Sequence, residues 1–303
     1  MREVRIPAYA KVNLRLEVLG KRDDGHHELR TVFQTVSLQD TLHFRSTRRP
    51  GISLTIQGNE ELSREAVERN LVYRAVEALR AEWKHRPGVD IRLRKRIPAG
   101  RGLGGGSSDA AAALLGYLRF LGKTIEPARL LGIAAGLGAD VPFFLLGGRA
   151  LGVSKGDEIY PLPDVPRFSL LIVSPRGIKV PTPDAYRWLR APQLASLTKI
   201  AADHKLYKFC ALCWSAQGAC LSNDFEPAVF RRHPRLGQIK RALLRAGASE
   251  ALLAGSGSAV FGVFPSPAKA RRAAVGFLHD QSFVCESVSR KRYARVLQTA
   301  FVV

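Results

Sequence analysis

The sequence predicts an α+β protein with two domains, and three observations support this fold class. Its 303 residues are more than a typical single domain needs. Strand patterns and helix patterns are mixed in both halves of the chain, as is typical of α+β domains. The proline-rich stretch PLPDVPRF (161–168) lies between the halves and looks like a linker. We therefore expect an N-terminal domain at 1–163 and a C-terminal domain at 164–303.

The first hundred residues are rich in strand patterns, in which apolar residues alternate with polar ones as in half-buried strands. We expect strands in NLRLEVL (13–19), GISLTIQG (51–58) and GVDIRL (88–93). Between the last two strands, Val72, Val76, Leu79 and Trp83 recur at helical spacing. Asn70 precedes this run, so it is well placed to cap a helix that begins there.

Helices and strands continue through the rest of the chain. Residues 108–121 and 127–136 predict two helices, and Pro142 suits the first turn of a third. In the second half we expect, in order, a strand in FSLLIV (168–173), two or three helices within 184–246, a strand–glycine turn–strand unit in ALLAGSGSAVFGVF (251–264), a helix at 267–278 and a strand at 282–288.

The composition is that of an ordinary soluble protein, with 46% apolar and 24% charged residues. The N-terminal segment lacks the apolar core of a signal peptide. The most apolar long stretch, 130–153, is interrupted by Asp140, Pro142 and Arg149, so it does not suit a membrane span. Four cysteines are too few for a disulfide framework. We therefore expect a cytoplasmic protein with no membrane partner.

The formal net charge of +21 favours acidic partners such as phosphorylated small molecules, nucleic acid or anionic lipid. The basic residues occur in short runs scattered along the chain, at 45–49, 92–96, 231–235 and 290–295. None forms a basic arm, and no aromatic RNA-binding signature lies among them. We therefore expect a phosphorylated small molecule rather than nucleic acid as the partner. The oligomeric state is left open.

The most distinctive segment is RIPAGRGLGGGSSDAAAALL (96–115), a glycine-rich loop that leads into an alanine-rich helix. Glycine clusters cost folding entropy, so a globular chain rarely keeps one without a function. Backbone N–H groups of such a loop, at a helix N-terminus, bind anions. The leading interpretation is therefore a phosphate-binding loop, in which Ser107, Ser108 or Asp109 could bind phosphate oxygens or help to place a magnesium ion.

Three alternatives fit this loop less well. The Walker A pattern requires a lysine where this chain has Gly106. The dinucleotide pattern is matched by Gly100, Gly102 and Gly105, but no strand ending in an acidic residue follows at the required distance. A simple glycine turn capped by a serine or aspartate would need one such residue and not the whole run.

Three segments together resemble the signatures of the GHMP kinases, a family that includes galactokinase, homoserine kinase, mevalonate kinase and phosphomevalonate kinase. In the family's order, they are AYAKVNLRLEV (8–18), GLGGGSSDAA (102–111) and LLAGSGSAVFGVF (252–264). Two further segments, DGHHEL (24–29) and GADVPFF (138–144), resemble the branch of this family whose acceptor alcohol carries cytidine diphosphate. The matching segments run from residue 8 to about 264, so the resemblance spans most of the chain.

The resemblance implies the two-domain GHMP kinase fold. Its N-terminal domain is like the second domain of ribosomal protein S5, its C-terminal domain is ferredoxin-like, and ATP and substrate meet between them. ATP is the implied phosphate donor, accompanied by Mg2+. The positions that match the family's ATP site are Asn70, Lys95, Pro98, Gly100, Gly102, Leu103, Gly104, Gly105, Gly106, Ser107 and Ser108. The role of Arg101, where the family often has a small residue, stays open.

The resemblance also implies the catalytic residues. Asp140 matches the family's general base, and Lys11 matches its catalytic lysine. A carboxylate can accept the proton of an attacking hydroxyl, and a lysine beside it favours the ionised form. The implied reaction is phosphorylation of the 2-hydroxyl of a CDP-linked methylerythritol, in the non-mevalonate route to isoprenoids. From the residues alone, Asp140 could instead cap the turn before Pro142, and Lys11 could be a solvated strand residue.

The acceptor site implied by the resemblance comprises Asn13, His26, His27, Thr182, Tyr186, Gly255 and Ser256. His27 matches the residue that reads cytosine. His26 stands where the family commonly has a tyrosine that stacks on the base, and Tyr186 matches the aromatic residue opposite. We therefore expect cytosine between His26 and Tyr186. Imidazole stacks with less area than a phenol ring, which affects the tightness of cytidine binding rather than the reaction class.

Other functions make different predictions. A GHMP kinase for a small alcohol such as homoserine or mevalonate would need no cytidine pocket. A nucleic-acid-binding protein on the same fold would bind RNA in a salt-sensitive way, whatever residue stands at Asp140. A nucleotide sensor without catalysis would have no use for Lys11 and Asp140.

A zinc site is a further alternative, which the sequence disfavours. Its ligands would be Cys210, Cys213, Cys220 and His204. The apolar run that contains the cysteines, YKFCALCWSAQGAC, is typical of a packed helix in which cysteine is a small hydrophobic residue. We therefore predict no protein-bound metal site.

Overall fold

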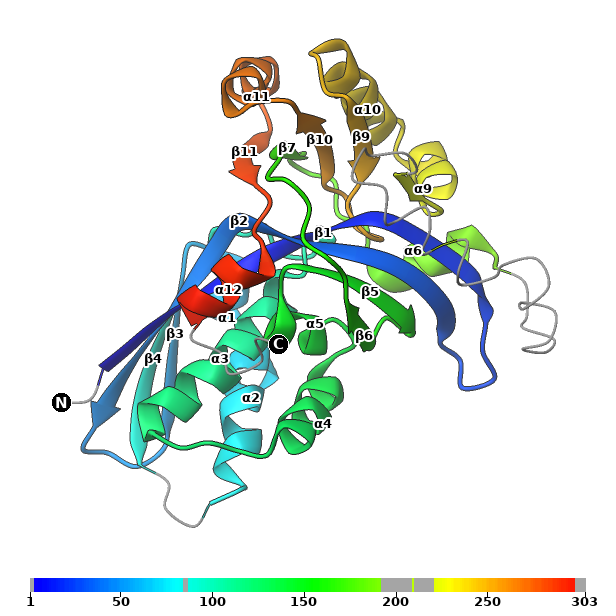
Figure 1. The fold of residues 1–303 in the computed structure, drawn as a ribbon. Coiled ribbons are helices and arrows are strands. Elements are labelled where there is room, and N and C mark those ends of the chain that lie inside the picture. The colour runs from blue at the N-terminus through cyan, green and yellow to red at the C-terminus, as the bar shows by residue number, and fades with distance from the viewer. Residues whose placement is uncertain (1–2, 84–86, 192–208, 210–220, 298–303) are drawn as a thin grey trace.

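The computed structural model describes residues 3–83, 87–191, 209 and 221–297, which form the two lobes seen in Figure 1. The lower lobe in that view holds a sheet with the strand order β3-β4-β2-β1-β8, to which β5 and β6 are joined through β2. The upper lobe holds an antiparallel sheet with the order β11-β7-β10-β9. Helices accompany both sheets, so the predicted α+β class is confirmed.

A long antiparallel hairpin of β1 (Glu3–Lys21) and β2 (His27–Thr47) runs through the lower lobe. The other strands of this sheet are β3 (Ile52–Gln57), β4 (Gly88–Arg94), β5 (Arg149–Ser154), β6 (Glu158–Pro161) and β8 (Ser222–Asn223). The strands predicted within β1, β3 and β4 are confirmed. The sequence analysis does not predict β2, because much of its central part is buried on both faces and lacks the alternation of a half-buried strand.

Helices pack against this sheet. They are α1 (Glu60–Arg64), a 3-10 turn (Val67–Arg69), α2 (Leu71–Arg80), α3 (Gly105–Leu121), α4 (Pro127–Leu137) and α5 (Val141–Leu146). The predicted cap of α2 is confirmed, since Asn70 Oδ1 accepts a hydrogen bond from Val72 N at 2.9 Å. Helix α3 begins at Gly105, earlier than the predicted start at residue 108, because Gly104 turns the chain with a φ of 69°.

The upper lobe contains β7 (Ser169–Ser174), α6 (Thr182–Leu189), α9 (Glu226–Arg232), α10 (Pro234–Arg245), β9 (Glu250–Leu253), β10 (Val260–Phe264), α11 (Pro267–Ala274), a 3-10 turn (Val275–Phe277) and β11 (Gln281–Glu286). In the sheet, β7 lies between β10 and β11. Along the chain, α6, α9 and α10 lie between β7 and β9, and α11 lies between β10 and β11. This is the ferredoxin-like arrangement that the resemblance implies. The cysteines and the histidine of the alternative zinc site lie outside the described residues.

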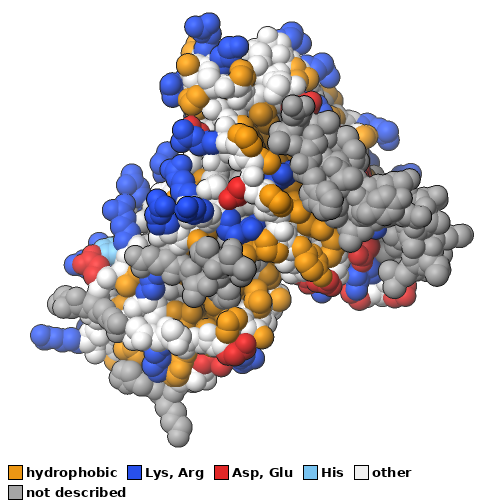
Figure 2. All heavy atoms as spheres, in the orientation of Figure 1, with side chains coloured by type: hydrophobic (Ala, Val, Ile, Leu, Met, Phe, Trp, Pro, Cys, Tyr) orange, Lys and Arg blue, Asp and Glu red, His pale blue; other side chains and the backbone are white. Residues whose placement is uncertain are grey.

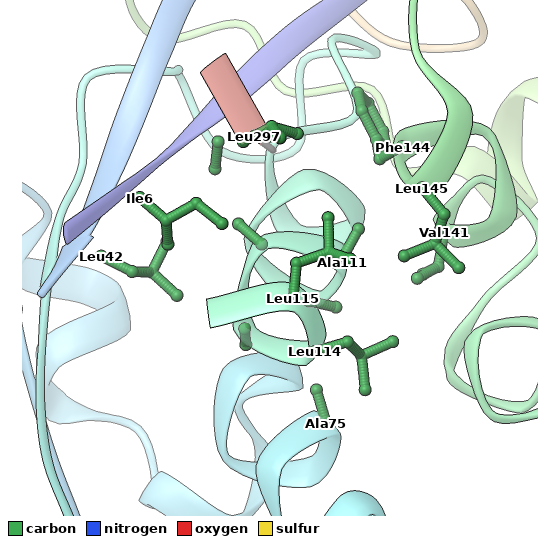
Figure 3. Close-up of a cluster of buried hydrophobic side chains, with 14 of the residues drawn as sticks. Ile6, Leu42, Ala75, Ala111, Leu114, Leu115, Val141, Phe144, Leu145 and Leu297 are labelled. Atoms are coloured by element: carbon green, nitrogen blue, oxygen red, sulfur yellow. The ribbon is translucent and has the colours of Figure 1, made fainter. Parts of the chain in front are cut away.

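A last helix, α12 (Arg290–Leu297), is not predicted by the sequence analysis and returns to the lower lobe (Figure 1). Tyr293 and Leu297 belong to the same buried cluster as Ile6 of β1. Figure 3 shows Leu297 beside Ile6 and above α3. Half of the residues of RKRYARVL are basic, so the segment looks solvent-exposed in the sequence although one side of it is buried.

A second buried cluster joins the lobes. Val12 of β1 and Val36 of β2 share it with Leu170 of β7 and Phe261 of β10. Burial of apolar side chains from both sheets in one cluster fixes the lobes against each other. The two lobes thus share part of their hydrophobic core. The domain boundary at residue 163 stays a prediction.

The surface is strongly basic. In Figure 2, Lys and Arg side chains occur on both lobes of the face shown, and acidic side chains are fewer. This distribution agrees with a formal net charge of +21. Among the described residues, no helix is long and apolar enough to cross a membrane.

Candidate active site between the lobes

A cleft of about 1080 Å³ is lined by residues of both lobes. It contains most of the predicted site, namely Lys11, Asn13, His26, His27, Pro98, Gly100, Gly102, Leu103, Gly104, Gly105, Gly106, Ser107, Asp140, Thr182, Tyr186, Gly255 and Ser256. These residues come from segments far apart in the sequence. Their convergence on one cleft is the main structural support for treating them as a single site.

The two predicted catalytic side chains form an ion pair in this cleft. Lys11 Nζ lies 3.3 Å from Asp140 Oδ2. The lysine side chain is 6% exposed and the aspartate side chain 32% exposed, so the carboxylate is the member of the pair that an incoming molecule can reach. Asp140 occupies the residue before α5, yet its side chain caps no backbone N–H there. Asp140 therefore does not cap the helix, which was the alternative role that the sequence left open.

Lys11 is held by a chain of buried hydrogen bonds on β1 and β2. Its ammonium donates to Asn13 Oδ1 at 2.8 Å, and Asn13 Nδ2 donates to Thr31 Oγ1 at 2.7 Å. The Thr31 hydroxyl in turn donates to the carbonyl of Arg15 at 2.7 Å. The ammonium also lies 5.1 Å from the ring centroid of Phe33. These contacts fix the direction of the lysine side chain before any ligand binds.

Glycine residues let two loops approach this lysine. Gly104 has a φ of 69°, and a Cβ there would lie 2.7 Å from the Phe144 ring and 3.0 Å from Lys11 Cγ. Gly255 has a φ of 55°, and its Cβ would lie 3.2 Å from Asn13 Oδ1 and 3.6 Å from Lys11 Nζ. Both positions therefore favour glycine for conformation and for space.

The glycine-rich loop is attached directly to the catalytic strand, since the backbone N–H of Lys11 donates to the carbonyl of Leu103 at 3.0 Å. The loop then enters α3, whose N-terminal backbone N–H groups and dipole favour an anion. Ser107 lines the cleft in the first turn of that helix. A glycine-rich loop that enters a helix N-terminus therefore lines the same cleft as the Lys11–Asp140 pair.

Aromatic rings also line the cleft. His27 stacks on Tyr186 with ring centroids 4.4 Å apart and an angle of 26° between the planes. His26, the residue expected on the other side of cytosine, is largely exposed and lies beside Asp24, and the position of cytosine between His26 and Tyr186 stays a prediction. Burial raises the pKa of the Tyr186 hydroxyl, and the nearby Asp140 raises it further. Burial lowers the pKa of His27, and Lys21 and His26 lower it further.

The loop before β10 completes the wall. The Ser256 hydroxyl donates to Thr182 Oγ1 at 3.1 Å, which links this loop to α6. Asn223 Nδ2 donates to the carbonyls of Leu253 and Gly255 at 2.9 and 2.8 Å. The loop is therefore held on both sides, and its position does not depend on a ligand.

Three predicted ATP-site residues do not line the cleft. Asn70 caps α2, as described above. Ser108 is buried within α3, and its hydroxyl has no hydrogen-bond partner there. Lys95 is buried between the carboxylates of Asp40 and Asp109. Their contacts with ATP remain predictions from the resemblance.

The cleft also contains residues that the sequence analysis did not select. Thr31 and Phe33 lie on β2, which the sequence pattern does not reveal as a strand. Further basic side chains line the cleft at Lys21, Lys155, Arg187 and Arg190. Basic residues are frequent throughout this chain, so nothing in the sequence alone distinguishes these from the surface ones.

Models of known families match both halves of the chain. The GHMP kinases N terminal domain matches residues 70–148, and the GHMP kinases C terminal domain matches residues 206–278. A 4-diphosphocytidyl-2-C-methyl-D-erythritol kinase of Solibacter usitatus is 45% identical over 300 residues, which cover 99% of this chain and 93% of that protein. The chain belongs to this family of GHMP kinases. It is therefore an ATP-dependent kinase.

Other GHMP kinases support the assignment. A 4-diphosphocytidyl-2-C-methyl-D-erythritol kinase of a Geobacter species is 42% identical over 90% of this chain and 94% of its own length. A crystal structure of 4-(cytidine 5'-diphospho)-2C-methyl-D-erythritol kinase matches with a TM-score of 0.74 at 36% identity, covering 93% of this chain and 98% of that one. A homoserine kinase of Cytophaga hutchinsonii, with a TM-score of 0.72 at 22% identity, shares the fold.

The electrostatics of the cleft suit a GHMP kinase, whose donor is the polyanion ATP. The basic side chains that line it are Lys11, Lys21, Arg101, Lys155, Arg187 and Arg190, whereas the acidic ones are Asp140 and Asp157. An excess of positive charge in a cleft raises the local concentration of anionic ligands. Part of the large net charge of the chain is thus concentrated at the kinase site.

Proposed function

We propose that this kinase transfers the γ-phosphoryl group of ATP to the 2-hydroxyl of 4-(cytidine 5'-diphospho)-2-C-methyl-D-erythritol. The observation that carries the proposal is the Lys11–Asp140 pair, which lines one cleft together with the glycine-rich loop and the aromatic pair of His27 and Tyr186. The names of the relatives support the choice of acceptor. A cleft with a glycine-rich loop and aromatic rings suits a donor phosphate chain and an acceptor with a nucleobase.

Asp140 is proposed as the general base. The acceptor oxygen forms a bond to the γ-phosphorus, while the bond from that phosphorus to the oxygen of the ADP leaving group breaks. The hydroxyl proton passes to the Asp140 carboxylate as the new bond forms. Lys11 lies 3.3 Å away and is itself held by Asn13, so it can stabilise negative charge on the reacting oxygens.

The donor side is proposed to rest on the glycine-rich loop and on α3. Backbone N–H groups at the start of α3 would hold phosphate oxygens, and the basic residues of the cleft would offset their charge. Mg2+, when bound with ATP, neutralises charge on its phosphates. The Ser107 hydroxyl lines the cleft, and such an oxygen ligand fits a magnesium ion held mainly by phosphates. Asp109 does not suit this role, because it is buried against Lys95.

The acceptor side is proposed to rest on the aromatic pair. Tyr186 offers a ring face on which cytosine can stack. The His27 ring covers one face of Tyr186 in this structure, so cytosine would either displace His27 from that face or stack on the opposite face. The His27 ring nitrogen is proposed to form a hydrogen bond with the edge of cytosine. Another base would leave this nitrogen unpaired, so it would bind more weakly. The basic residues of the cleft, among them Lys21 and Arg187, suit the diphosphate.

The test is an assay with ATP, magnesium and 4-(cytidine 5'-diphospho)-2-C-methyl-D-erythritol, read by mass spectrometry for the singly phosphorylated product. The wild type should form it, and Asp140→Asn should lower kcat by about 10²–10⁴-fold. Asp90→Asn, which changes an acid of β4 outside the cleft, is the matched control and should be fully active. Bound ATP without product in the wild type would refute the acceptor, and an active Asp140→Asn would refute the base.

A further inference from the structure

Beneath the glycine-rich loop lies a buried cluster of three charged residues, Asp40, Lys95 and Asp109, which we call the buried clamp. The side chains are 0%, 3% and 5% exposed, respectively. Lys95 Nζ donates to Asp40 Oδ2 and, at 2.6 Å, to Asp109 Oδ2. None of the three lines the cleft. The clamp is therefore outside the set of groups that the phosphoryl transfer itself employs.

Asp40 anchors the chain that enters the loop. Its Oδ1 accepts hydrogen bonds from the backbone N–H of Arg96 and, at 2.8 Å, of Ile97. Asp40 belongs to the long strand β2, where it pairs with Ala8 of β1. The position of the entering segment is therefore set by the same sheet that carries Lys11.

Asp109 anchors the chain that leaves the loop, since it lies in the first turns of α3. Lys95 thus joins the two ends of the loop across 14 residues of sequence. Next to this bond, Ile97 packs under the start of α3, where a Cβ on Gly105 would lie 3.0 Å from Ile97 Cγ2 and 3.4 Å from Lys95 Nζ. The clamp closes the stem of the loop directly below the N–H groups expected to bind phosphate.

Burial of three ionisable side chains is costly, and it is tolerated only when they are well paired and hydrogen-bonded. Here the pairing is incomplete, because Asp109 Oδ1 has no hydrogen-bond partner. A core built for stability alone could fill this space with apolar side chains at no loss, or with a gain. The cost is consistent with a function in holding a glycine-rich loop, which loses much conformational entropy on becoming ordered.

We propose that Asp40, through Lys95 and Asp109, is a positioning residue for ATP: the buried clamp holds the glycine-rich loop in its nucleotide-binding conformation. In this proposal Asp40 and Asp109 touch neither ATP nor the acceptor, whereas the contact of Lys95 with ATP that the resemblance implies stays a separate prediction. It reduces the ordering that ATP would otherwise have to bring about on binding. The inference depends on ATP as the donor and not on the proposed acceptor.

The test measures the Kd for ATP by calorimetry without acceptor, so its result does not depend on the acceptor assignment. Asp40→Asn and Asp109→Asn should each raise the Kd by about 10–100-fold, as expected for a misplaced binding loop. Amide hydrogen exchange should become faster within residues 99–106 in both variants. Leu79→Ala, a cavity variant of the same lobe outside the cleft, is the stability control, and its Kd should be that of the wild type.

A triple variant, Asp40→Asn with Lys95→Met and Asp109→Asn, separates positioning from stability. Without buried charges it should unfold at a temperature no lower than that of Asp40→Asn, because no unpaired charge remains. Its Kd for ATP should nevertheless stay raised, because the clamp is absent, and Lys95→Met alone measures how much of that rise comes from a direct contact of Lys95 with ATP. The proposal is overturned if ATP binding recovers together with stability in the triple variant. It is equally overturned if folded Asp40→Asn binds ATP like the wild type.

Discussion

At the residue scale, the site depends on side chains that are fixed before ligand binds. Lys11 is directed by Asn13 and Thr31, and its partner Asp140 keeps the exposure that a general base requires. The resemblance identifies Lys11, Asn13 and Asp140, whereas Thr31 becomes visible only when β1 and β2 are paired. Residues that contact a substrate and residues that hold them in place are thus found by different means.

The aromatic pair yields a prediction about the acceptor. Tyr186→Ala should raise the KM for the cytidine-containing acceptor, because stacking of a base on an aromatic ring contributes about 1–3 kcal/mol. The KM for ATP should stay unchanged, since the proposal assigns Tyr186 to the acceptor and the glycine-rich loop to ATP. Steady-state kinetics with each substrate varied in turn would measure both. Tyr160→Ala, at an exposed position on β6, is the control. Equal increases in both KM values would contradict the assignment.

At the element scale, single residues at helix ends have structural duties that the family resemblance does not report. Asn70 is the example: the resemblance places it in the ATP site, and the structure shows it as the cap of α2. The two roles are compatible, and different substitutions separate them. Serine is a good helix cap but lacks the amide group, whereas alanine supplies neither.

We expect Asn70→Ala to lower the free energy of unfolding by about 0.5–2 kcal/mol through loss of the cap. Asn70→Ser should retain most of that stability. Urea denaturation would measure the contribution of the cap to the free energy of unfolding, and the KM for ATP in Asn70→Ser would report the nucleotide contact. A raised KM for ATP with retained stability in Asn70→Ser would support both roles. An unchanged KM for ATP would show that Asn70 acts only as a helix cap.

Helix α12 makes a second prediction at this scale. Leu297 is 2% exposed and lies in the core of the lower lobe, so Leu297→Ala should lower the free energy of unfolding by about 2–5 kcal/mol. The neighbouring Val296 is 39% exposed, and Val296→Ala should change the free energy of unfolding by less than about 0.5 kcal/mol. Chemical denaturation of both variants would show whether the helix belongs to the core. Similar values for the two would contradict the packing.

At the scale of the whole molecule, the lobes share two buried clusters, and the last helix returns from the upper lobe to the lower one. The cleft is therefore formed by parts that are held together without ligand. The residues of the site are also held in place without ligand, because the glycine-rich loop, Lys11 and the buried clamp all connect to β1 and β2.

The buried clamp makes stability depend on pH. Burial raises the pKa of Asp109 from 3.8 to about 8; the positive charge of Lys95 opposes the rise, and the negative charge of Asp40 adds to it. Between these values the folded state holds a proton that the unfolded state has lost. The stabilisation from this proton is thus complete below about pH 4 and is lost as the pH rises through about 8.

The corresponding measurement is urea unfolding at pH values from about 4 to about 9, with the wild type and Asp109→Asn side by side. The difference between the two in free energy of unfolding should change steadily with pH, because asparagine does not titrate. The other charged groups next to Asp109 are Asp40 and Lys95, and both remain in the variant. A difference that is constant over the whole range would show that Asp109 does not titrate there.

The sequence by itself determined what local patterns can encode. The alternation in β3 and β4, the cap at Asn70 and the glycine-rich loop all depend on neighbours in the chain. The signature segments identified the family without a structure, whereas the role of Asp140 stays a prediction. Strand β2 and helix α12 escaped detection, because one is buried on both faces and the other is basic on its exposed side.

Only the tertiary structure decided which distant residues meet. The His27–Tyr186 stack, the support of Lys11 by Thr31, and the clamp of Asp40 on Lys95 each join separate elements. No periodicity records such contacts, because they depend on sheet register and on the packing of the lobes. The physical reason is that local structure follows from hydrogen bonds and propensities along the chain, whereas a site follows from burial, which depends on the whole fold.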